Sequence, residues 1–172
     1  MTKVSIATWN VNSIRARLNV LLNWLKKKKP YILLLQELKA QKNDIPRTEL
    51  EELNYNFITF GQKAYNGVAI LSKYPVSDIT YNLPNFDQDK QSRYIEGFIN
   101  LDKKGIRVAS IYAPNGNPIN SEKYSYKIEW LKKFCSISPS IHIKQKTRNV
   151  FGHKPFTKEN NKKVKDVYSF GY

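Results

Sequence analysis

Residues 4–37 have the sequence VSIATWNVNSIRARLNVLLNWLKKKKPYILLLQE, and this stretch decides the fold. Val4–Thr8 is a short β-type run, and the residues after it predict a helix that Ser13 caps and Pro30 ends. The apolar stripe of this helix consists of Ile14, Leu18, Leu21, Leu22 and Leu25. Tyr31–Leu35 is a continuous apolar run, which is typical of a strand covered on both faces. Together they indicate a βαβ unit with two parallel strands.

The unit places two polar side chains at strand ends. Asn10 ends the first strand, and Glu37 ends the second. In open α/β sheets ligands bind beyond the carboxyl ends of the strands, so this amide and this carboxylate should share one crevice. The alternative is that Glu37 is charged simply because the strand reaches the surface there. Position by itself leaves both interpretations open.

Further strands follow the unit. Asn56–Phe60, Gly67–Ser72 and Val76–Tyr81 have strand composition and are separated by turn residues. Arg93–Asn100 and Gly105–Tyr112 alternate apolar and polar residues, which predicts an antiparallel pair. A second helix should begin after Ser121, with its apolar positions at Tyr124, Ile128, Leu131 and Cys135. The chain is therefore predicted to be α/β with antiparallel additions.

The composition favours a polyanionic partner. The chain has 172 residues, 29 Lys plus Arg, 14 Asp plus Glu and a formal net charge of +15. Clustered cations bind phosphate backbones, although a Lys- and Asn-rich sequence can also reflect A-rich codons. Residues 1–120 have 17 cations and 10 anions, and residues 121–172 have 12 and 4, so over half of the net charge falls in the last part.

The composition also restricts where the chain acts. A single cysteine, Cys135, allows no internal disulfide and fits a reducing compartment. The longest apolar run is far shorter than the ~20 residues that span a bilayer, and no leader pattern is visible. We therefore expect a cytoplasmic protein that does not enter a membrane and is monomeric if it folds.

Five motifs, in order, resemble the exonuclease III family of bacterial apurinic/apyrimidinic endonucleases, within the endonuclease/exonuclease/phosphatase superfamily. The resemblance covers roughly residues 3–134. The motifs are ATWNVNSIRAR at 7–17, LLLQELK at 33–39, GQK with NGVAILSK at 61–73, SRYIE at 92–96 and IYAPNG at 111–116. The resemblance implies hydrolysis of DNA phosphodiesters in base excision repair. The substrate would be double-stranded DNA at abasic sites or 3′ ends.

The resemblance also implies roles for individual residues. Glu37 would bind a catalytic Mg²⁺ or Mn²⁺ together with Asn10, which agrees with the preference of Mg²⁺ for one or two carboxylates plus waters. Asn10 and Tyr112 would act at the scissile phosphate, where the phenol could stabilise the developing oxyanion. Supporting contacts to phosphate or to the DNA backbone would come from Asn12, Arg15, Lys63, Arg93 and Asn115.

The second half of the family pattern does not continue here. No Gly-Asp-x-Asn occurs, and the nearest segment in position is NVFGHKP at 149–155. The two histidines, His142 and His153, match no catalytic context. We therefore expect residues 1–135 to be the N-terminal part of the family's two-sheet α/β sandwich, followed by a basic divergent tail over residues 136–172.

Most of the second sheet should then be missing, which leaves an apolar face uncovered and predicts marginal stability, aggregation or need of a partner. Three functions stay open. The chain could be an active nuclease, an inactive truncated gene product, or a non-catalytic basic DNA-binding module.

Overall fold

The computed structural model describes residues 4–101, 104–143, 150–152 and 167–170. In chain order the elements are β1 (Val4–Asn10), α1 (Leu18–Lys28), β2 (Ile32–Gln36), the 3-10 helix η1 (Lys42–Asp44), α2 (Arg47–Glu51), β3 (Asn56–Phe60), β4 (Val68–Ser72), β5 (Val76–Tyr81), β6 (Tyr94–Leu101), β7 (Lys104–Ile111), α3 (Glu122–Ile143), β8 (Val150–Gly152) and β9 (Val167–Phe170).

The predicted βαβ unit is confirmed. β1 and β2 pair in parallel, with Asn10 opposite Gln36. The helix begins later than the sequence indicated: α1 starts at Leu18, and Arg17 rather than Ser13 is its N-cap. Ser13 has a φ of 86°, and its backbone N–H donates to the carbonyl of Glu37 at 2.8 Å. The backbone around Ser13 is therefore used to join the two strand ends.

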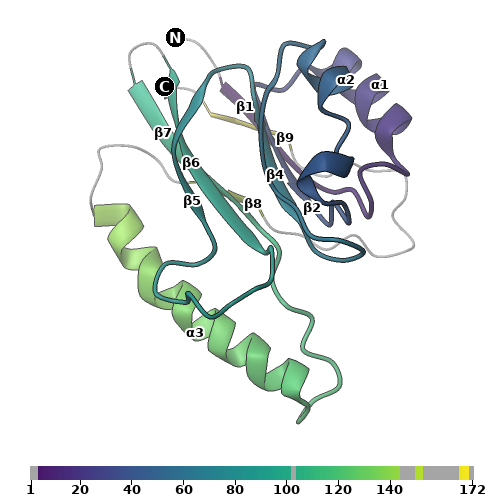
Figure 1. The fold of residues 1–172 in the computed structure, drawn as a ribbon. Helices are drawn as coiled ribbons and strands as arrows, with labels where there is room; N and C mark the ends of the chain where they lie inside the picture. The colour runs from purple at the N-terminus through teal and green to yellow at the C-terminus, as the bar shows by residue number, and fades with distance from the viewer. Residues whose placement is uncertain (1–3, 102–103, 144–149, 153–166, 171–172) are drawn as a thin grey trace.

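Two sheets face each other between helical layers (Figure 1). The first has the order β3-β4-β2-β1-β9, and the second has the order β5-β6-β7-β8. α1 and α2 lie outside the first sheet, and α3 lies along the outer side of the second (Figure 1). The two-sheet α/β sandwich predicted from the resemblance is confirmed.

The expectation of an uncovered apolar face is wrong. The segments from residue 76 to residue 111 form a separate antiparallel sheet of three strands, to which β8 adds in parallel. This sheet covers the inward face of the first one. Ile32 and Leu34 on β2 are fully buried in one cluster with Ile95 on β6 and Val108 on β7. The described strands thus already supply both sides of the central core.

Alternate side chains of β2 pack into two different cores. Leu33 and Leu35 point away from the second sheet and pack with Leu21 and Leu25 of α1. Ile32 and Leu34 point the other way, into the layer between the sheets. This explains why the strand is apolar at successive positions. A third cluster, which includes the buried Trp130 of α3, fastens that helix to the outer face of the second sheet.

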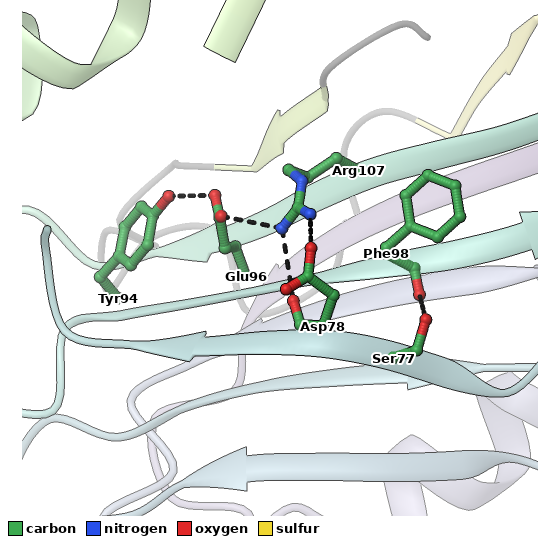
Figure 2. Close-up of polar contacts among 6 residues, drawn as sticks. All are labelled: Ser77, Asp78, Tyr94, Glu96, Phe98 and Arg107. Atoms are coloured by element: carbon green, nitrogen blue, oxygen red, sulfur yellow. Dashed lines mark hydrogen bonds and ion pairs between the residues drawn. The ribbon is translucent and has the colours of Figure 1, made fainter. Parts of the chain in front are cut away.

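A polar network also crosses that outer face (Figure 2). Arg107 on β7 pairs with Glu96 on β6, at 3.0 Å between Nη1 and Oε1, and with Asp78 on β5. The hydroxyl of Tyr94 donates to Glu96. Burial raises the pKa of Glu96, while the hydrogen bond from Tyr94 opposes that rise. Because the network joins three neighbouring strands on the side away from the inter-sheet core, we interpret it as a brace of the second sheet.

The last helix crosses the division expected at residue 135. Ser121 accepts a hydrogen bond from the Tyr124 backbone N–H at 3.3 Å, as a capping residue does, and α3 continues to Ile143. The separation into 1–135 and 136–172 stays a prediction. His142 lies within α3, and His153 lies outside the described residues. The helices in the described part of the chain are all too short or too polar to span a bilayer.

Candidate functional site

Three strand ends bring three predicted site residues together. Asn10 is the last residue of β1, Glu37 directly follows β2, and Tyr112 directly follows β7. β1 and β2 run in parallel within the first sheet, while β7 belongs to the second. The site therefore spans the edge between the two sheets.

The turns after β1 and β2 have unusual backbone geometry. Four non-glycine residues have left-handed φ values: Asn12 at 45°, Ser13 at 86°, Glu37 at 55° and Lys39 at 50°. Such conformations are costly for residues with side chains and persist where the surroundings enforce them. Here a backbone hydrogen bond of 3.0 Å from Ile14 to the Leu38 carbonyl reinforces the contact between the turns. This concentration of strained positions is typical of functional sites.

Glu37 is the centre of the cluster. Its Oε1 accepts hydrogen bonds from Asn10 Nδ2 at 2.7 Å and from the Tyr112 hydroxyl at 2.9 Å. Its Oε2 pairs with Lys39 Nζ at 3.1 Å, and 17% of the side chain is exposed. Burial alone would raise the pKa of Glu37, but the bonds from Asn10, Tyr112 and Lys39 outweigh it and lower that pKa. Glu37 is therefore a carboxylate at neutral pH, and its side chain is partly exposed to solvent.

Lys39 is a site residue that the sequence analysis did not single out. Besides pairing with Glu37, its Nζ donates to Asn12 Oδ1 at 2.6 Å. Asn12 in turn donates its backbone N–H to Asn10 Oδ1 at 3.1 Å. The signal for Lys39 in the sequence was its position two residues after Glu37, just beyond a buried strand. Side chains two residues apart in an extended segment point to the same side, so Lys39 could lie beside Glu37.

Arg93 contacts both the ring and the backbone of Tyr112. The Arg93 guanidinium lies over the Tyr112 ring, 5.0 Å from its centroid, and Nη1 donates to the Tyr112 carbonyl at 3.2 Å. Burial raises the pKa of Tyr112 to about 12, and the neighbouring Glu37 adds to that rise while Arg93 opposes it. The phenol therefore keeps its proton at neutral pH. The contact of Arg93 with phosphate or the DNA backbone stays a prediction; in the structure its guanidinium contacts Tyr112.

Three other predicted residues lie outside this hydrogen-bonded cluster. Asn115 is exposed, and its Oδ1 accepts from Asn117 Nδ2 at 3.0 Å. Arg15 is exposed in the turn before α1. Lys63 lines a shallow depression of about 650 Å³ together with Gln41, Gly61, Gln62, Ala64 and Tyr65. Among the described residues, no hydrogen bond or ion pair links these three side chains to Glu37.

The donor set of the cluster suits a hard divalent cation held mainly by water. Within the described ranges, no group of three or more His, Cys, Asp or Glu side chains gathers in one place. The cluster offers one carboxylate, Glu37, and the amide oxygen of Asn10, which is the small oxygen set that Mg²⁺ commonly uses. The oxygen ligands present therefore fit such an ion, which would compete with Lys39 Nζ for Glu37 Oε2.

Comparison with known proteins gives a consistent result. Residues 7–132 match the model of the Endonuclease/Exonuclease/phosphatase family. Exodeoxyribonuclease III of Haemophilus influenzae is 31% identical over 109 residues, which cover 63% of this chain and 41% of that protein. A structure of a 3′ phosphatase from Neisseria bound to product DNA hairpin superposes with a TM-score of 0.80 and 34% identity, covering 86% of this chain and 56% of that one.

A structure of an AP endonuclease from Archaeoglobus fulgidus gives a TM-score of 0.70 and 40% identity, over 76% of this chain and 49% of that one. The chain thus spans between 41% and 56% of the length of these three proteins.

Proposed function

The chain belongs to the endonuclease/exonuclease/phosphatase family, and on this premise we propose that it hydrolyses DNA phosphodiesters at the Asn10, Glu37 and Tyr112 cluster with a divalent cation. Nucleases of this family generally use divalent metals. The proposed ion is Mg²⁺ or Mn²⁺, and the proposed substrate is double-stranded DNA with abasic sites or 3′ ends. The names of the relatives support this choice, since they include an exodeoxyribonuclease and an AP endonuclease.

One observation carries the proposal. Two donors from different sheets, Asn10 Nδ2 and the Tyr112 hydroxyl, converge on a single oxygen of Glu37. A structural salt bridge would not need the strained backbone that holds this carboxylate. The arrangement therefore supports a site built to present an ionised carboxylate beside a protonated phenol.

The residues have distinct tasks in this proposal. Glu37 and Asn10 would hold the ion, which supplies charge stabilisation at the phosphate and a polarised water when bound. Tyr112 keeps its proton at neutral pH, so it can donate a hydrogen bond to a phosphate oxygen as charge develops. Lys39 lies on the other oxygen of Glu37 and adds positive charge for an anionic substrate. Arg93 keeps the Tyr112 ring in place.

A second candidate function is DNA binding without cutting. The missing Gly-Asp-x-Asn motif and the net charge of +15 favour it. β8 pairs in parallel with β7, Gly152 lying opposite Ser110, so its carboxyl end lies at the same edge as the site. NVFGHKP at 149–155 is the segment nearest in position to the Gly-Asp-x-Asn motif that the resemblance implies. Action as a cytoplasmic monomer stays a prediction of the sequence.

The test is incision of a duplex with one abasic site by the purified chain, with Mg²⁺ and with EDTA. We expect Mg²⁺-dependent cutting that is lost in Glu37→Ala. The matched control is Glu51→Ala, which removes a carboxylate from an exposed pair on α2 and should leave cutting intact. If the native chain cuts no more than Glu37→Ala does, the proposed nuclease activity is rejected. Salt-dependent duplex binding in that case would establish the binding module.

A further inference from the structure

A buried polar bridge joins the two sheets directly beneath the site. Gln36, the last residue of β2, is 1% exposed, and its Nε2 donates to Ser110 Oγ on β7 at 3.1 Å. Ser110 is fully buried and donates its own hydroxyl to the Leu35 carbonyl at 2.8 Å. Gln36 Nε2 also donates to Thr8 Oγ1 on β1 at 3.1 Å. Three strands from two sheets therefore meet at one amide.

This bridge lies in a largely apolar layer. The apolar residues buried between the sheets are all aliphatic: Val4, Ile6, Ile32, Leu34, Val68, Ile70, Ile95, Ile99, Ile106 and Val108. Burying an amide and a hydroxyl in such a layer is costly unless both are hydrogen-bonded. An apolar pair would fill the same space without that cost, but apolar contacts have no direction. A hydrogen bond requires defined distances and angles, so the bridge restricts sliding of one sheet over the other.

The bridge is adjacent to the site in the sequence on both sides. Gln36 precedes Glu37, and Ser110 lies two residues before Tyr112. The Tyr112–Glu37 hydrogen bond of 2.9 Å crosses between the same two sheets at their edge. A shift of about 1 Å between the sheets would move this contact beyond the normal range of 2.5–3.0 Å for such a bond.

We propose that Gln36 is a positioning residue, whose bridge to Ser110 fixes the second sheet against the first and so holds the Tyr112 hydroxyl on Glu37. As a statement about catalysis, it rests on the nuclease function proposed above. As a statement about geometry, it concerns only the folded chain and is testable without activity.

The experiment measures the energetic coupling between Tyr112 and Glu37 in the folded chain. Urea unfolding of Tyr112→Phe, Glu37→Leu and the double variant gives a coupling factor, since Glu37→Leu removes the accepting oxygens. For a hydrogen bond to a charged group this factor should be about tenfold or more. The same cycle is then repeated in a Gln36→Met background, which keeps the side-chain length and removes the bridge. We expect the coupling factor to fall close to one.

A Ser72→Ala background is the matched control. Ser72 is as fully buried as Ser110, but its Oγ accepts from the Tyr74 backbone N–H, outside the bridge. The Ser72→Ala change should lower the free energy of unfolding and leave the coupling between Tyr112 and Glu37 unchanged. Ser110→Ala removes the same bridge with a smaller change, and it replaces Gln36→Met if that variant does not fold. Unchanged coupling in the bridge variants, or no coupling in the native background, would overturn the proposal.

An activity measurement separates this inference from the proposed function. If the native chain cuts DNA, the bridge variant should lower kcat with little change in KM, because the DNA contacts remain. If the native chain does not cut, the nuclease proposal fails, and the coupling measurement still decides the role of Gln36. If the chain cuts and the coupling survives in the bridge variants, only the inference about Gln36 fails.

Discussion

The core between the two sheets is tested by replacing Ile95 with Ala. Ile95 is fully buried on β6 and faces Ile32, Leu34 and Ile70 of the first sheet in the same cluster. Truncating a buried isoleucine to alanine costs about 2–5 kcal/mol, from lost burial and from the cavity left behind. With a urea slope of roughly 2 kcal/mol per molar, the unfolding midpoint should fall by about 1–2.5 M.

The same chemical change at an exposed place provides the control. Ile119 is 69% exposed, so Ile119→Ala should alter stability by no more than about 0.5 kcal/mol. Unfolding is followed by circular dichroism and by tryptophan fluorescence, which should give coincident transitions. Equal small shifts for both variants would show that the sheets do not pack together in solution. Absence of a cooperative transition in the native chain would refute the folded core altogether.

Three further predictions concern single side chains. Tyr112→Phe should lower kcat for Mg²⁺-dependent cutting roughly tenfold to a hundredfold at similar KM, because only a hydroxyl is removed. Lys39→Met should raise the lowered pKa of Glu37, which NMR of the metal-free chain can measure. As the pH falls, the variant should therefore lose the stability contributed by ionised Glu37 at a higher pH than the native chain does. Tyr55 has its pKa raised to about 12 by burial, so its contribution to stability is complete below pH ~10 and is lost toward pH 12. Urea unfolding at pH 9 and at pH 11 should therefore show a smaller drop in the free energy of unfolding for Tyr55→Phe than for the native chain.

Much of the first sheet and of the site could be predicted from local pattern. The apolar run at 31–35 indicated a strand covered on both sides, and its two faces do pack against different layers. Parallel strands end at the same edge, which is why Asn10 and Glu37 could be placed together. The convergence of Tyr112 on Glu37 depends on a contact between sheets, and only the family resemblance indicated it.

The second sheet could not be predicted in the same way. Alternation predicts strands at 93–100 and 105–112, close to the observed β6 and β7, but it does not say which sheet they join or what they face. The expectation that most of the second sheet is missing left an apolar face without cover, whereas in the structure these strands belong to the second sheet and supply that cover. Gln36 and Ser110 were uninformative in the sequence, because a polar residue in a strand usually faces solvent. Their role depends on a hydrogen bond between residues 74 positions apart.

The Mg²⁺ dependence of abasic-duplex incision, compared between the native chain and Glu37→Gln, bears most directly on the proposed site. Glu37→Gln keeps the size of the side chain and removes its charge, so the surrounding hydrogen bonds are disturbed as little as possible. We predict a cutting rate that saturates with Mg²⁺ in the native chain and vanishes in EDTA. The variant should show no such saturation in the same range. Equal cutting by the two proteins at every Mg²⁺ concentration would contradict the assignment of Glu37 as the metal-binding carboxylate.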